Sequence, residues 1–124
     1  SRIKPQPKAN ACLSIGTGAY GVDPFGNLYK CWMDIGSFEH SVGRLENTGE
    51  VKYNQVEILK WLSYNPFNDN DCAKCKILPL CVGGCYYYPI RLGQKRCCEL
   101  KYQLKEYLLL CASQIDAQKQ NERR

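Results

Sequence analysis

Nine of the 124 residues are cysteines, and their spacing indicates that most of them bind metal. The strongest local pattern is Cys72-x2-Cys75-x5-Cys81-x3-Cys85, within the stretch DCAKCKILPLCVGGC. A Cys-x2-Cys element turns two thiolates toward one centre, and further ligands then fold back over that centre from later in the chain. An odd number of cysteines also leaves at least one thiol outside any set of intramolecular disulfides. We therefore expect a metal-binding loop here.

Two glycines inside this loop suit the same chemistry. Gly83 and Gly84 lack a Cβ atom, so the backbone is free to adopt positive φ angles and to bring amide N–H groups close to sulfur. Such hydrogen bonds are among the features that tune the potential of an iron-sulfur cluster. Zinc remains open as an alternative, because tetrahedral thiolate sites with Cys-x2-Cys elements bind it readily.

Further cysteines lie on both sides of the loop. Upstream, Cys12 is followed by thirteen residues, Gly26, four residues and Cys31, and a turn at Gly26 would let Cys31 approach Cys12. Downstream stand the adjacent Cys97 and Cys98. Adjacent cysteines rarely bond to each other, because the geometry strains the intervening peptide. We therefore expect one of these two to be a ligand and the other a bystander.

Joined in order, these pieces give C-x13-G-x4-C, a gap, C-x2-C-x5-C-x3-C, a gap and a final C. This order resembles the seven-cysteine motif of the SPASM domain, which follows the barrel of radical SAM enzymes, including anaerobic sulfatase maturases and many enzymes that modify ribosomal peptides. The resemblance covers roughly residues 12 to 98 and includes the flanking sequences LYKC, VGRLEN and PLCVGGC.

The resemblance implies two auxiliary 4Fe-4S clusters with separate ligands. The first cluster would be held by Cys12, Cys31 and Cys85. The second would be held by Cys72, Cys75, Cys81 and one of Cys97 or Cys98. Relatives use another cysteine just upstream of the position of Cys12, and residues 1–11 contain none. The missing ligand would come from elsewhere in a longer protein, or that iron is open to a substrate, a water or a non-cysteine ligand.

The resemblance also implies a role inside a larger enzyme. The Cys-x3-Cys-x2-Cys loop that holds the SAM-cleaving cluster in the family has no counterpart among these nine cysteines. S-adenosylmethionine and a third 4Fe-4S cluster would therefore belong to an upstream barrel. We expect this chain to serve electron transfer and substrate positioning in a radical SAM enzyme that modifies a peptide or protein, with the barrel and that substrate as its partners. A zinc-stabilised binding module without a redox role and a standalone ferredoxin-like electron carrier are the alternatives.

The elements that position these thiols form, on the sequence evidence, a small metal-stabilised α+β domain. Strand-like runs at 19–22 and 28–32 flank a turn at 23–27, which predicts a β-hairpin. After a glycine-containing loop, an apolar stripe at 54–64 predicts a helix that ends before Asn65-Pro66. Little regular structure is expected over 69–98. The clearest helix is expected at 99–118, with a core stripe of Leu100, Leu104, Tyr107, Leu108 and Cys111.

The sequence also gives expectations for the domain boundaries, the partners and the location of the protein. We expect residues 1–10 to be the end of a linker, 11–118 the cysteine-rich domain and 119–124 a frayed polar tail. The net charge of +5 is scattered without an interleaved aromatic motif, so we expect no nucleic-acid partner. No apolar run approaches membrane-spanning length and no signal-peptide core is present, so we expect a cytoplasmic protein without a membrane partner. A reducing cytoplasm also favours metal over disulfides.

The sequence also predicts where the histidine and several aromatic side chains lie. His40 is the only histidine and is expected on the surface in a loop rather than as a ligand. The aromatic run Tyr86–Tyr88 is expected to pack over a cluster and shield it from water, with a peptide-binding wall as the alternative. Trp32 and Trp61 are expected to anchor the core.

Overall fold

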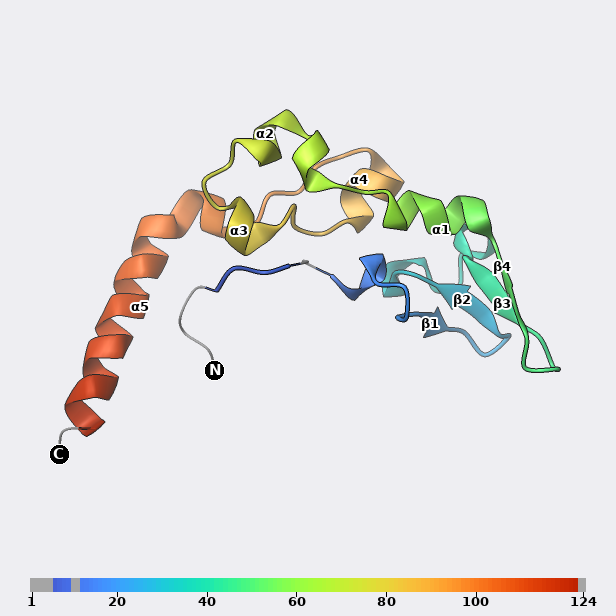
Figure 1. Cartoon of the computed structure of the whole chain (residues 1–124), viewed down its shortest axis with the longest axis horizontal. Coiled ribbons are helices and arrows are strands. Elements are labelled where there is room, and N and C mark those ends of the chain that lie inside the picture. Colours follow the sequence, from blue (N-terminus) through green and yellow to red (C-terminus); the bar gives the residue numbers. More distant parts are fainter. Residues whose placement is uncertain (1–5, 10–11, 123–124) are drawn as a thin grey trace.

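An antiparallel sheet followed by helices makes up residues 6–9 and 12–122, the part of the chain that the computed structural model describes. This is the α+β class that the sequence predicts. The strands are β1 (Gly21–Val22), β2 (Asn27–Tyr29), β3 (Gly43–Leu45) and β4 (Val51–Tyr53), paired in that order. The α-helices are α1 (Gln55–Leu62), α2 (Asn70–Ala73), α3 (Leu78–Cys81), α4 (Tyr87–Leu92) and α5 (Leu100–Glu122). The sheet and α1 lie at one end of the molecule, α2 to α4 lie in the middle, and α5 projects from the other end (Figure 1).

The predicted hairpin is present, and a buried aspartate holds its turn. Gly21 pairs with Tyr29, and Val22 pairs with Leu28. The Asp23 carboxylate accepts hydrogen bonds from the backbone N–H groups of Phe25 and Asn27, both at 2.9 Å. Gly26 has a φ of +84°, and a Cβ there would lie 2.9 Å from the carbonyl oxygen of Leu45, so this turn requires glycine. Cys31 lies two residues after the end of β2, with Lys30 between them.

A second hairpin replaces part of the loop that the sequence predicts after residue 35. Strands β3 and β4 pair through Arg44 and Lys52, and Gly43 of β3 also pairs with Leu28 of β2. Each strand has only three residues, too few for an alternating pattern to distinguish them from a loop. The loop prediction was therefore wrong over these two strands.

Helix α1 and the core follow the sequence expectations except at one tryptophan. The Asn54 side chain caps α1 by accepting a hydrogen bond from Glu57 N–H at 3.3 Å, and the helix ends ahead of Asn65-Pro66. Trp61 is fully buried, as expected. Trp32 is 82% exposed, so its prediction as a core anchor was wrong. The buried core cluster consists of Leu28, Val42, Ile58, Trp61 and Tyr86.

The second half of the chain is more helical than predicted. Three short helices, α2 to α4, lie within 69–98, where little regular structure was expected. Helix α5 begins at Leu100 and continues to Glu122, past the expected end at Gln118, while 123–124 lie outside the described residues. Of the expected core stripe, only Cys111 is fully buried, and Leu108 is 45% exposed. None of the helices in 6–9 and 12–122 combines the length and apolar character that crossing a membrane requires.

The expected linker lies mostly outside the described residues. Residues 1–5 and 10–11 are not described, so the boundary at residue 10 stays a prediction. Within 6–9, the Lys8 backbone N–H donates to the carbonyl oxygen of Pro79 at 2.9 Å. The N-terminal segment therefore contacts α3.

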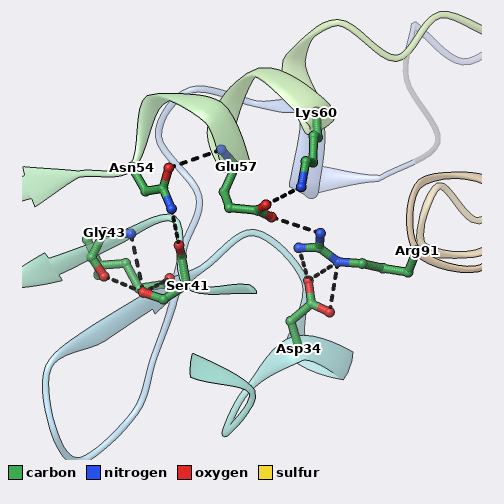
Figure 2. A network of polar contacts seen from close by, with 8 residues as sticks. Asp34, Ser41, Gly43, Asn54, Glu57, Lys60 and Arg91 are labelled. Carbon is green, nitrogen blue, oxygen red and sulfur yellow. Dashed lines mark hydrogen bonds and ion pairs between the residues drawn. The ribbon is translucent and has the colours of Figure 1, made fainter. Parts of the chain in front are cut away.

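A buried arginine joins three segments that are distant in sequence. The Arg91 side chain on α4 is only 5% exposed, and it lies between Asp34 of the 3-10 helix η2 (Trp32–Asp34) and Glu57 of α1. Arg91 Nη2 lies 2.7 Å from Asp34 Oδ2, and Nη1 lies 2.8 Å from Glu57 Oε2 (Figure 2). Both carboxylates are buried. The guanidinium neutralises Asp34, whereas Glu57 pairs with both the guanidinium and Lys60.

Replacing Arg91 tests this dependence. Arg91→Met is expected to lower the free energy of unfolding by about 3–5 kcal/mol, because it removes the guanidinium from the buried Asp34 carboxylate and leaves Glu57 with Lys60 alone. The control is Lys52→Met, which removes the exposed ion pair with Glu46 and is expected to cost at most about 1 kcal/mol. Urea denaturation followed by tryptophan fluorescence measures both, and equal losses would contradict a structural role for the buried pair.

The same network predicts an acid-sensitive contribution to stability. Burial opposes ionisation of Glu57, but hydrogen bonds from Lys60 and Arg91 outweigh it and lower the pKa of Glu57 below its ordinary value of 4.5. A carboxyl group whose pKa is lowered by folding stabilises the fold above its ordinary pKa and loses that contribution as the pH falls through the folded value. Glu57→Gln should therefore flatten the decline of the urea midpoint below pH 4.5. Parallel pH profiles for the two proteins would rule this out.

Candidate metal centre

The first group of thiols forms where the sheet meets the segment before α4. Cys12 and Cys31 both pack against the buried core cluster, and Cys85 lies just before the core residue Tyr86. Burial raises the pKa of Cys31, the Met33 N–H opposes this by hydrogen-bonding to the sulfur, and the charges of Asp34, Cys85 and Cys12 raise it further. Cys31 therefore lies within electrostatic reach of both other thiols. These three are the residues assigned to the first cluster.

The ion pair of the buried Arg91 with Asp34 brings the segments of Cys85 and Cys31 together. Asp34 lies three residues after Cys31, and Arg91 lies six residues after Cys85. Their ion pair, with Arg91 Nε 3.0 and 3.1 Å from the two Asp34 oxygens, therefore ties the two cysteine-bearing segments together. The sequence analysis did not single out either residue. No local pattern marks two partners that are 57 positions apart.

The second group contains five thiols in the middle of the molecule. They line one narrow cavity of about 20 Å³ between α2, α3 and the segment before α5. Burial raises the pKa of Cys81, while hydrogen bonds from the backbone N–H groups of Cys98 and Gly83 oppose the rise. Burial and the charge of Asp69 raise the pKa of Cys72, which also interacts with Cys97. The five are Cys72, Cys75, Cys81, Cys97 and Cys98.

A left-handed stretch of backbone separates Cys81 from Cys85. Val82, Gly83 and Gly84 have φ angles of +49°, +84° and +72°. The two glycines adopt such angles without penalty, whereas a β-branched valine in this region costs on the order of 1–3 kcal/mol. Beyond this turn, Cys81 is in hydrogen-bond contact with Cys98, while Cys85 lies within electrostatic reach of Cys31 and lines a hollow that Cys97 and Cys98 also line. The Gly83 N–H reaches a sulfur, as the sequence analysis predicted for these glycines.

Charged side chains surround the second group. Lys95 contacts Asp69 at 2.8 Å and Asp71 at 3.0 Å, and its hydrogen bond is the main reason that the pKa of Asp69 falls to about 2. Asp69 also caps α2 and accepts a hydrogen bond from the Cys72 N–H at 3.0 Å, which fixes the backbone of that cysteine. Lys101 lies four residues after Cys97, with its Nζ 3.5 Å from the sulfur. Neither lysine was identified from the sequence, and Cys97 lies before the start of α5, so helical spacing does not link it to Lys101.

The donors are of the kind that holds an iron-sulfur centre, with three thiols in the first group and five in the second. All nine cysteines lie within the described residues, each is a free thiol, and eight of them belong to the two groups. No three His, Cys, Asp or Glu side chains of 6–9 and 12–122 lie close enough together to hold one metal ion. A multi-iron cluster places a different demand on its ligands, because each thiolate binds its own iron and the sulfurs surround a volume. In the second group, the thiols would have to move apart to admit such a core.

An aromatic hollow adjoins both groups. It measures about 820 Å³, and its walls include Trp32, Cys85, Tyr87, Tyr88 and Tyr107. Cys85 is exposed, whereas the other eight cysteines are half-buried or buried. Within the aromatic run, Tyr86 belongs to the core cluster, Tyr87 both packs against that cluster and lines the hollow, and Tyr88 lines the hollow.

Two remaining candidates lie apart from these groups in the fold. His40 is half-buried at the end of the 3-10 helix η3 (Phe38–His40), so it reaches the surface as expected but lies in a short helical turn rather than in a loop. Cys111 is buried on α5, as expected, where its thiol is in hydrogen-bond contact with the Tyr107 hydroxyl. It does not belong to the core cluster, so its burial comes from its own helix and nearby side chains.

Two glycine-to-alanine variants test whether the tight turn before Cys85 is needed to form the second group of thiols. A Cβ at Gly84 would lie 2.8 Å from the Arg96 carbonyl oxygen and 3.8 Å from Cys81 Sγ, so Gly84→Ala must displace the segment that carries Cys97. We expect it to lower both the urea midpoint and the metal content. Gly93→Ala is the matched control, because Gly93 has a φ of +61° but open space around its Cβ position. Equal effects would show that only the backbone angle matters.

Comparisons with known proteins were made at three levels. No family model, curated protein or solved structure matches the chain. The two groups of thiols and the charged residues around them are therefore the basis for its functional assignment.

Proposed function

We propose that this chain is an auxiliary iron-sulfur domain of a radical SAM enzyme that modifies a peptide or protein, of the SPASM type. One observation carries the proposal: Cys81 and Cys85 are four positions apart, yet Cys81 is in hydrogen-bond contact with Cys98 whereas Cys85 interacts electrostatically with Cys31. Two clusters that share one loop require this division, whereas a single metal site in the loop would bring both sulfurs to one centre. The rest of the ligand set follows the same division.

In this proposal the protein's residues do four things. Cys12, Cys31 and Cys85 bind the first cluster, while Cys72, Cys75, Cys81 and one of Cys97 or Cys98 bind the second. The backbone N–H groups of Met33 and Gly83 donate to ligand sulfurs, and the core limits water around Cys31. The Arg91–Asp34 pair holds the first set in place. Clusters of this type supply one-electron transfer when bound.

The hollow beside Cys85 supports a role in substrate positioning. Its aromatic walls provide large apolar contact area with polar tips, which suits an extended peptide. A cluster held by three thiolates also leaves one iron for a substrate atom, a water or another ligand. S-adenosylmethionine and the cluster that cleaves it belong to the barrel of the full enzyme. We assign the protein to the cytoplasm, where reducing conditions keep its thiols available for metal.

Anaerobic reconstitution with iron and sulfide tests the proposal. We expect a brown protein with about eight irons per chain, since two 4Fe-4S clusters contain that number. Cys81→Ala and Cys85→Ala should each lose about half of the iron, each removing a different electron paramagnetic resonance signal, and the double variant should lose nearly all of it. Cys111→Ala is the control and should keep the full content.

Three results would contradict the proposal. A colourless chain with stoichiometric zinc would establish the zinc-stabilised module instead. Loss of the same iron signal in Cys81→Ala and Cys85→Ala would place both thiols on one centre. Full redox function as a separate electron carrier, with no barrel in the complete protein, would support the ferredoxin-like alternative.

A further inference from the structure

A second, charged hollow borders the five-thiol group. It measures about 550 Å³ and lies between α2, the segment that follows α2 and the start of α5. Among the described residues it has no lining residue in common with the aromatic hollow, but it shares Cys75 and Lys101 with the narrow cavity of the thiols. We call it the lysine hollow, after the three lysines in its wall, Lys74, Lys76 and Lys101. Through Cys75, the second group of thiols therefore borders a hollow of its own.

Positive charge dominates the lysine hollow. Lys74, Lys76 and Lys101 are all exposed, and within the described part of the chain none of them has an ion pair with a carboxylate. Asp71 supplies the one carboxylate among the described lining residues, and its Oδ2 lies 3.0 Å from the Nζ of Lys95. The acidic group is therefore already paired, and three ammonium groups surround the hollow without a carboxylate partner.

The walls of the lysine hollow suit a negatively charged protein surface better than a small anion or a nucleic acid. Like charges around one concave site concentrate the field there and attract an anionic partner from solution. Among the described lining residues there is no arginine, and none of the three lysines is buried, so the hollow has neither the fork nor the enclosure of a small-anion site. The same residues include no aromatic side chain on which the bases of a single strand would stack.

The position of the lysine hollow indicates which kind of acidic protein fits it. Cys75 is half-buried and lines the hollow, so a protein docked there would lie against the second group of thiols. Small, transient interfaces guided by complementary charge are typical of electron-transfer pairs. The aromatic hollow, where we place the peptide, has separate walls. A peptide and an acidic electron carrier would therefore reach the domain through different surfaces.

We propose that the lysine hollow is the docking surface for an acidic electron-carrier protein, which exchanges one electron with the metal centre of the second group. The exchange rests on the proposed function, whereas the preference for an acidic protein surface rests on the lysines alone. When the carrier is the donor, it loses one electron and the cluster gains it, and no group is transferred. Exposed lysines attract over a distance and are screened by salt, so docking is expected to weaken as the ionic strength rises.

Binding of a fluorescently labelled acidic flavodoxin to the reconstituted full chain tests the surface. Fluorescence anisotropy at low ionic strength is expected to show binding that salt weakens, and no binding of the basic protein cytochrome c. Lys74→Glu/Lys76→Glu should weaken the binding by about tenfold or more, and Lys74→Gln/Lys76→Gln by a smaller factor. The control, Arg44→Glu/Lys52→Glu, changes the net charge by the same amount at exposed residues of β3 and β4, at the far end of the molecule (Figure 1). It should weaken the binding by less than about twofold.

The rate of cluster reduction gives a second measurement. Reduced flavodoxin should reduce the Lys74→Glu/Lys76→Glu chain more slowly than the wild type, by a factor similar to the loss of binding. Reduced methyl viologen is a small cation that does not need an acidic docking surface, so it should reduce both proteins without that loss. Equal iron content in the two proteins then shows that the substitutions act on docking and not on the clusters.

Several results would overturn the docking surface. Equal weakening in the Lys74/Lys76 and Arg44/Lys52 variants would show that net charge alone accounts for binding. Tighter binding of a single-stranded oligonucleotide through the same lysines would replace the acidic protein by a nucleic acid. Loss of iron in Lys74→Glu/Lys76→Glu with unchanged anisotropy would assign these lysines to the metal centre. Zinc in place of iron in the wild type would contradict the proposed function and the electron exchange, while the anisotropy would still decide whether the hollow docks an acidic protein.

Discussion

The pairing of Arg91 with two buried carboxylates is the constraint on which the arrangement depends. A guanidinium is buried only when its partners are already in place, so η2, α1 and α4 must dock together. Figure 2 shows that these partners come from three separate elements. Because Asp34 follows Cys31 and Arg91 follows Cys85, one electrostatic requirement of folding also brings two candidate ligands into one region. The geometry of the first group is therefore a consequence of the fold and not of the cysteines alone.

The second constraint is the direction of the backbone between Cys81 and Cys85. Three successive residues there, Val82, Gly83 and Gly84, have positive φ angles. The surroundings of the two groups also differ in charge. A carboxylate neutralised by Arg91 lies near the first group, whereas Lys95 and Lys101 lie beside the second. Two clusters bound here would therefore have different electrostatic environments within one small domain.

Folding and metal binding are coupled by the small size of the core. The fully buried large side chains are concentrated around the sheet and α1, and α5 contributes only Cys111 to the buried apolar residues. The segment from α2 to α4 has Ile77, Leu78 and Tyr86 as its buried apolar residues. A metal-thiolate centre would give this segment the cross-links that its few apolar contacts do not provide. Stability and metal content are therefore expected to change together in variants of the loop.

The sequence by itself determined the elements whose signals are local. The first hairpin, the helix after Asn54, the long C-terminal helix, the positive φ angles at Gly83 and Gly84 and the burial of Trp61 all follow from short patterns. Tertiary structure decided what depends on distant partners: the three-residue strands β3 and β4, the exposure of Trp32, and the buried network around Arg91. Spacing identified the eight candidate thiols and the family resemblance divided them into two sets, but only the fold showed which distant residues hold their segments together, because contacts between residues far apart in the chain leave no periodic trace in the sequence.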